Sequence, residues 1–262
     1  MSLSSGMGDT GDLPKAVVVC RDREDLGRQA AFSFVQSAGE AVSHRGRFSV
    51  ALAGGDTPRT LYRCLASPAF AEKIPWAKVH LFWGDERAVP PDHPESNYRR
   101  VYETLISKVS IPLENVHRMP GERSDLEGAA RAYEEELRSF FEPPKGGWPS
   151  FDLVLLGIGS DGHTASLFPG SAVLKESVRW VAAPYVEKLK AARLTLTLPM
   201  LNHARQAIFL VAGKEKAPIM REILLVDPPP TDPPARRVQL RKGRPLFFLD
   251  RDAAGLIEKS LR

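Results

Sequence analysis

The stretch LVLLGIGSDGH, residues 153–163, joins the most apolar run of the chain to a polar, glycine-rich loop. The run at 153–158 is too short for a membrane span and has the length of a buried strand. Continuous apolar strands are typical of a parallel sheet that is covered on both faces. In such sheets ligands bind beyond the carboxyl ends of the strands. We therefore expect the loop at 159–163 to lie at a functional site.

Strand-like and helical patterns alternate on both sides of this stretch. Further strands are expected at residues 16–20, 48–53, 79–83, 193–198, 208–212 and 246–249. Helices are expected at 26–42, from Pro58 onward, at 97–109, from the capping box at Ser124 to 141, at 214–226, and after Asp250. The alternation predicts one α/β domain over residues 13–262. Its architecture is three-layered and Rossmann-like without a dinucleotide, with a mainly parallel sheet and helices on both faces. Residues 1–12 read as a disordered tail.

Composition narrows the class of protein. The 262 residues include 36 Lys and Arg against 32 Asp and Glu, and a net charge of +4 is too small to predict nucleic-acid binding. The one basic run, at residues 236–244, is expected to be a solvated loop. Cys20 and Cys64 have no metal-ligand spacing, which predicts a protein without a metal site in a reducing compartment. No apolar run is long enough for a membrane span, and the first residues lack the pattern of a signal peptide. We expect a cytoplasmic monomer that binds neither membranes nor nucleic acid.

The loop after the apolar run fits two known motifs poorly. Residues 157–162 satisfy GxGxxG, but Pro169-Gly170 interrupts the long helix that a dinucleotide site needs. The required acidic residue is also missing about 20 residues further on. A serine-hydrolase elbow fails because Ile158 stands where that motif has glycine. Asp161-Gly162-His163 remains, and His163 is either a structural histidine or a proton carrier at neutral pH.

Other loops that follow strands carry polar and charged residues. Gly54-Gly55-Asp56-Thr57-Pro58 is either a phosphate-binding turn or a turn that Asp56 or Thr57 caps. Asp85-Glu86-Arg87 is either a salt bridge or a carboxylate and a cation for a substrate. Lys214 and Lys216 begin a helix, and either solvent or an anionic ligand offsets their conflict with the helix dipole. Arg193 is either exposed at an edge or directed into a polar site. These residues suggest an α/β enzyme for a small phosphorylated substrate, with His163 as the proton carrier.

Together these segments resemble the 6-phosphogluconolactonase family, within the glucosamine/galactosamine-6-phosphate isomerase superfamily, from Asp22 to the C-terminus. The most specific stretch is residues 156–169, LGIGSDGHTASLFP. The other segments that carry the resemblance are residues 54–58, 84–87, 96–98, 193–197 and 213–217.

The resemblance implies hydrolysis of 6-phospho-D-glucono-1,5-lactone to 6-phosphogluconate in the oxidative pentose phosphate pathway, without a cofactor. His163 matches the general base of the family, and Asp85 matches a residue that orients the catalytic groups. The positions that match substrate or phosphate binding are Gly54, Gly55, Thr57, Arg87, Asn97, Arg193 and Lys216. Asp56 replaces the serine of the family's GGSTP loop, and its carboxylate would repel a phosphate.

Two other functions fit parts of this pattern. Glucosamine-6-phosphate deaminases look similar but follow the histidine with an Asn-Glu-Pro segment, whose glutamate serves catalysis. Residues 166–169, Ser-Leu-Phe-Pro, contain no carboxylate. A non-catalytic sugar-phosphate sensor usually carries a further DNA-binding or partner domain, for which the expected single domain leaves no room. The lactonase is therefore the function that the sequence favours.

Overall fold

The computed structural model describes residues 16–257, so the tail expected at residues 1–12 lies outside the described residues. The strands are β1 Ala16–Cys20, β2 Phe48–Leu52, β3 Val79–Trp83, β4 Asp85–Arg87, β5 Val116–His117, β6 Leu153–Leu156, β7 Val181–Ala182, β8 Tyr185–Val186, β9 Ala191–Leu196, β10 Ala207–Val211 and β11 Leu246–Asp250. The α-helices are α1 Arg23–Arg45, α2 Asp56–Leu65, α3 Pro68–Ala71, α4 Asn97–Thr104, α5 Leu126–Phe141, α6 Leu198–Asn202, α7 Ala217–Leu225 and α8 Arg251–Ala254.

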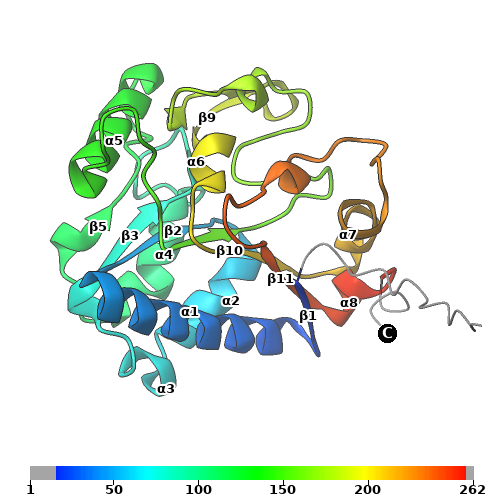
Figure 1. Ribbon diagram of the computed structural model, residues 1–262, viewed down its shortest axis with the longest axis horizontal. Helices are drawn as coiled ribbons and strands as arrows, with labels where there is room; N and C mark the ends of the chain where they lie inside the picture. The colour runs from blue at the N-terminus through cyan, green and yellow to red at the C-terminus, as the bar shows by residue number, and fades with distance from the viewer. Residues whose placement is uncertain (1–15, 258–262) are drawn as a thin grey trace, which may run out of the picture.

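Seven strands form the main sheet in the order β1-β11-β10-β6-β2-β3-β5. Every neighbouring pair in this sheet is parallel. Figure 1 shows α1 and α2 below the sheet and α5 and α6 above it. This arrangement confirms the predicted α/β class with a mainly parallel sheet between layers of helices.

The direction in which the chain builds the sheet reverses between β2 and β6. From β2 the chain adds β3 and β5 on one side, whereas β6, β10 and β11 extend the sheet on the other. Such a reversal leaves a crevice at the carboxyl ends of the two central strands, where open α/β sheets bind ligands. The loop after β2 is Gly54–Pro58, and the loop after β6 contains His163. The topology therefore brings together the two glycine-rich loops that the sequence singled out.

Apolar periodicity placed the buried faces correctly. All residues of β2, β6 and β10 are buried, as expected for strands that are covered on both faces. The predicted stripe of α1 faces the core, and Leu26, Ala30, Phe34, Ala38 and Ala41 are at most 1% exposed. Among residues 16–257, no helix combines the length and the apolar character needed to cross a membrane.

Several element ends differ from the sequence prediction. Helix α2 begins at Asp56 rather than Pro58, and its cap is Gly55, so neither Asp56 nor Thr57 caps it. The cap of α5 is Asp125, whose side chain accepts from the Gly128 N–H, and not Ser124 of the expected capping box.

The expected helices at 97–109 and 214–226 are also shorter than predicted. Helix α4 ends at Thr104, and α7 begins at Ala217 after a 3₁₀ turn at Lys214–Lys216. In each of these cases the local pattern gave the right element, but its limits depend on packing.

A second, antiparallel sheet lies beside the main one and was not predicted as a sheet. Its order is β4-β9-β7, and β8 also pairs with β9. Residues 85–87, expected as a loop, pair with residues 193–195 of β9. The sequence could not show this pairing, because a three-residue strand has no readable periodicity.

A chain of three polar side chains joins β3, β5 and α5. Nδ1 of His80 lies 3.3 Å from Nε2 of His117, and Nδ1 of His117 lies 2.7 Å from a carboxylate oxygen of Glu136. Burial, followed by repulsion from His117 and Arg47, lowers the pKa of His80 from 6.5 to about 4. His80 is therefore neutral in the folded protein at a pH where the unfolded chain already binds the proton.

We expect this depressed pKa to make folding sensitive to acid. The unfolded state binds more protons as the pH falls from about 6.5 to 4, so the contribution of His80 to the free energy of unfolding is lost over that range. The loss is at most about 3 kcal/mol. Urea unfolding of the wild type and of His80→Phe at several pH values measures it. A difference between the two proteins that does not change with pH would contradict the prediction.

Candidate active site

A cavity of about 320 Å³ opens at the carboxyl ends of β2, β6 and β10. All predicted site residues except Arg193 line it: Gly54, Gly55, Thr57, Asp85, Arg87, Asn97, His163 and Lys216. The fold therefore brings together residues that are up to 162 positions apart in the sequence.

His163 is held by Asp161. This residue belongs to the same motif, but the sequence predicted no role for it in the site. Nδ1 of His163 lies 2.5 Å from Oδ1 of Asp161, and Nζ of Lys188 lies 2.9 Å from Oδ2. Burial raises the pKa of Asp161, but the hydrogen bonds from Lys188 and His163 outweigh it and lower that pKa to about 2. An ionised carboxylate only accepts hydrogen bonds, so Nδ1 of His163 carries the proton. Nε2 of the neutral ring is then the free base.

Packing fixes the plane of this imidazole. The ring of Phe168 stacks on it, with centroids 4.2 Å apart. On another side, a Cβ on Gly159 would lie 2.1 Å from the His163 ring, so only glycine fits at that position. The glycine of the motif therefore makes room for the imidazole.

Asp85 is fixed by partners from two distant segments. Its Oδ2 accepts from the Ser166 hydroxyl at 2.7 Å, and its Oδ1 accepts from the Asn97 side chain at 3.3 Å. The same Asn97 amide donates to the Asp85 carbonyl at 2.9 Å. These bonds point the Asp85 carboxylate in one direction beside the cavity that His163 also lines.

Glu86, next to Asp85 in the chain, is a buried residue that holds the backbone of this part of the site. It is 2% exposed and accepts the backbone N–H groups of Arg87, Asn97 and Tyr98 at 2.7–2.8 Å. Burial raises the pKa of Glu86, and these three hydrogen bonds oppose that rise only in part. Glu86 thus holds the start of α4 against β4, and with it the backbone of Asn97 and Arg87.

The glycine loop has the geometry of an anion site. Gly55 has φ +94°, and α2 begins after it without a side-chain cap. Backbone N–H groups in the first turn of a helix lack partners within the helix and attract anions. Gly54 must lack a side chain, because a Cβ there would lie 1.9 Å from Oδ1 of Asn97.

Arg193 lies on a second, adjoining cavity of about 280 Å³. The two cavities share Asp85, Arg87, His163 and Ala165, whereas Lys216 lines only the first and Arg193 only the second. Arg87 and Arg193 stand opposite each other across β4 and β9. Burial, and next the charge of Arg87, lowers the pKa of Arg193.

Neither Arg87 nor Arg193 forms an ion pair with any of the described carboxylates. Two like charges opposite each other in a sheet destabilise it, and an anion between them would remove the repulsion.

Sequence reasoning assigned no role in the site to Asp161, Ser166, Lys188 and Arg23. Asp161 and Ser166 are in the most specific stretch of the resemblance, so their position two or three residues from His163 was a usable signal. No such signal marked Lys188 or Arg23, because both lie outside the motif. Lys188 lines the second cavity from the segment between β8 and β9, and Arg23 lines the first from the start of α1.

The chain is similar to known proteins in sequence and in fold. A 6-phosphogluconolactonase of Synechocystis sp. is 44% identical over 82% of this chain and 86% of that protein. The solved structure of 6-phosphogluconolactonase from Trypanosoma cruzi has a TM-score of 0.83 and 32% identity, over 94% of this chain and 98% of that chain. A monomeric glucosamine-6-phosphate deaminase has a TM-score of 0.76 over 92% of this chain and 99% of that chain, and its 24% identity shows the fold alone.

A model of a protein family also matches most of this chain. The model for glucosamine-6-phosphate isomerases/6-phosphogluconolactonase matches residues 21–247, which include both cavities and the elements that build them. The chain belongs to the glucosamine-6-phosphate isomerase/6-phosphogluconolactonase family.

Proposed function

We propose that the protein hydrolyses 6-phospho-D-glucono-1,5-lactone to 6-phosphogluconate, as a step of the oxidative pentose phosphate pathway. The named relatives support this activity. The observation that carries it is the environment of His163. Its hydrogen-bonded carboxylate is Asp161, and its stacking partner is the apolar ring of Phe168. The site thus offers one positioned base beside a cavity, which is sufficient for the hydrolysis of an activated ester.

His163 would act as the general base through Nε2. A water molecule gives a proton to Nε2 while its oxygen attacks the lactone carbonyl carbon. Asp161, on Nδ1, stabilises the imidazolium that forms and keeps the ring in the reactive tautomer. The tetrahedral intermediate then expels the ring oxygen, which takes the proton back from His163. The products are the open-chain acid and a regenerated base.

Substrate phosphate would be bound by the N–H groups at the start of α2 together with Lys216, Arg87 and Arg193. Arg87 lines both cavities, so an anion next to it is accessible to cations from both sides. Asp85, held by Ser166 and Asn97, would orient the substrate hydroxyls and the attacking water. The side chain of Asp56 is exposed and would not contribute to phosphate binding.

A paired assay tests the proposed activity against deamination. We expect the protein to accelerate acid release from freshly made 6-phosphogluconolactone above the rate without enzyme. We also expect it to release no ammonia from glucosamine 6-phosphate, because Phe168 stands directly before Pro169 where the deaminases have their glutamate. Release of ammonia without lactone hydrolysis would overturn the proposal. Binding of both sugar phosphates without turnover would favour the sensor.

Substitution of the phosphate-binding cations should change KM more than kcat. We expect Arg193→Ala and Lys216→Ala each to raise KM about tenfold or more, because a contact that is equal in the ground and transition states acts on KM alone. Steady-state kinetics on the lactone measures both constants. Arg63→Ala is the matched control, because Arg63 is an exposed arginine that lines neither cavity. An unchanged KM in either variant would assign that residue to the solvated surface.

A further inference from the structure

Three arginines line a cavity at the opposite end of the sheet from the catalytic loops. The cavity has a volume of about 420 Å³ and includes Arg45, Arg47 and Arg205 among its lining residues. It lies at the amino ends of β2 and β6, where Ser49 and Asp152 are located. It shares no lining residue with either cavity around His163. The proposed reaction therefore does not account for its charges.

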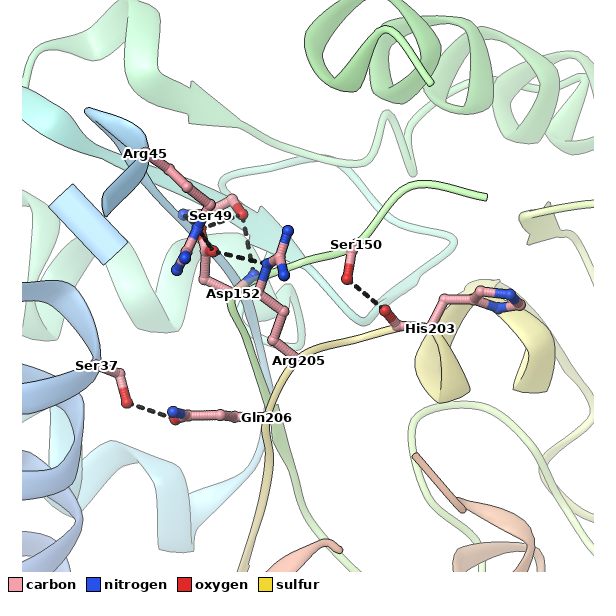
Figure 2. Close-up of polar contacts among 8 residues, drawn as sticks. All are labelled: Ser37, Arg45, Ser49, Ser150, Asp152, His203, Arg205 and Gln206. Carbon is pink, nitrogen blue, oxygen red and sulfur yellow. Dashed lines mark hydrogen bonds and ion pairs between the residues drawn. The ribbon is translucent and has the colours of Figure 1, made fainter. Parts of the chain in front are cut away.

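A buried carboxylate holds two of the arginines in place. Asp152 is 7% exposed, and its Oδ2 accepts from both the N–H and the hydroxyl of Ser49 at 2.8 Å. Its Oδ1 lies 2.8 Å from Nε of Arg45 and 3.5 Å from Nε of Arg205. Figure 2 shows the two guanidinium groups next to Asp152, with Arg45 on α1 and Arg205 on the segment that leads to β10.

Both arginines approach Asp152 through Nε, so their outer nitrogens remain available. Nη1 and Nη2 of Arg45 and Arg205 have no hydrogen-bond partner among residues 16–257. Arg47 is fixed differently: its Nη2 donates to the Phe140 carbonyl at 2.9 Å, and its guanidinium lies 4.1 Å from the centre of the Phe140 ring. Hydrogen bonds thus hold Arg45 and Arg47, whereas Arg205 is held by an ion pair alone. All three keep unused donors, which is the chemistry that binds oxyanions.

The charges around this cavity do not balance. The lining residues include the three arginines but only two carboxylates, Asp152 and Glu142. Arg45 ends α1, where the carbonyl end of a helix favours one cation, but this explains neither Arg47 nor Arg205. The excess is one positive charge, which a bound phosphate group would offset while its oxygens use the free donors.

Apolar and cyclic side chains also line the cavity, namely Phe141, three prolines and Trp148. The Trp148 ring is fixed by stacking on His203, with centroids 4.8 Å apart. With Trp148, Arg45 and Arg47 held in this way, little has to become ordered when a compact ligand binds.

We propose that Arg45, Arg47 and Arg205 form a second anion site, which binds a phosphate group, either as the free ion or on a small phosphomonoester. The site is separate from the catalytic cavity and independent of the proposed reaction. Arg47 and Arg205 supply the fork-shaped donors for the phosphate oxygens. Arg45 is held by Asp152 and supplies a third group of hydrogen-bond donors.

Calorimetric titration at fixed ionic strength tests this site, with inorganic phosphate and glycerol phosphate as two separate probes. The background is the double variant Arg193→Ala/Lys216→Ala, which weakens anion binding in the catalytic cavity. In this background we expect binding of one phosphate group to persist. Equal affinity for the two probes would assign the site to the free ion, and tighter binding of glycerol phosphate would assign it to a phosphomonoester.

Added to that background, Arg47→Gln and Arg205→Gln should each weaken binding about tenfold or more, the usual effect of losing a hydrogen bond to a charged group. Arg63→Gln, which removes an exposed arginine far from the cavity, should leave affinity unchanged. Thermal unfolding without ligand verifies that each variant is folded. Loss of all binding in the double variant alone would overturn the proposal, as would equal affinities in all the arginine variants.

Discussion

Replacement of His163 by Asn is expected to lower kcat for the lactone by about 10²–10⁴, which is the usual contribution of a general base. Asparagine is smaller, but its side-chain amide can replace Nδ1 as the donor to Asp161, and it cannot take a proton from water. Because binding of the phosphate is unaffected, KM should change little. Steady-state rates, corrected for spontaneous hydrolysis of the lactone, measure the effect.

Two controls make this result specific. His44→Asn replaces an exposed histidine on α1 that lines neither catalytic cavity, and it should retain the wild-type rate. The unfolding temperature of His163→Asn should stay close to that of the wild type, because the side chain is 32% exposed. A near-normal kcat in His163→Asn would assign the proton transfer to another group, with Asp85 the first candidate.

The second large effect is expected on stability rather than on proton transfer. Glu86→Ala should lower the free energy of unfolding by about 3–5 kcal/mol, because three backbone N–H groups lose their acceptor. For a chain of this length, that loss lowers the unfolding temperature by about 5–9 °C. Activity should also fall, since the same hydrogen bonds place Arg87 and Asn97 beside the substrate.

Two further variants separate this role from a loss of charge. Glu86→Gln keeps an acceptor oxygen and should recover part of the stability. Glu103→Ala removes an exposed glutamate that is paired with Arg99 on the same helix, and it should cost less than about 0.5 kcal/mol. Equal stability of Glu86→Ala and Glu103→Ala would show that Glu86 does not hold the start of α4.

Glu86 also shows where sequence reasoning stopped. The sequence pattern predicts a loop at Asp85-Glu86-Arg87 that carries a carboxylate and a cation. In the structure it is a strand of the second sheet, and its buried middle residue accepts the first two N–H groups of α4. Alternation along a strand puts neighbouring residues on opposite faces, so a strand here separates Glu86 from Asp85 and Arg87. A loop prediction for this segment cannot show that Glu86 and its two neighbours face opposite sides.

Lys216 and Arg193 illustrate a second limit. The resemblance matches both cations, like Arg87, to positions that bind substrate or phosphate. The structure divides them between two adjoining cavities that Arg87 joins, so their convergence on one group stays a proposal. Residue type and spacing identify candidate ligands, but the relative positions of two loops depend on the whole chain path.

The sequence by itself predicted six of the seven strands of the main sheet, all except the two-residue β5, and the two loops at the crevice. Each of these follows from local patterns, namely apolar periods of fixed length and glycines directly after strands. Only the tertiary structure decided which partners complete the site: Ser166 on Asp85, Lys188 on Asp161, and Arg193 opposite Arg87. These pairs are 27 to 106 residues apart in the chain, and no local pattern encodes such contacts. They arise because the reversal between β2 and β6 and the small antiparallel sheet bring distant segments to the same end of the main sheet.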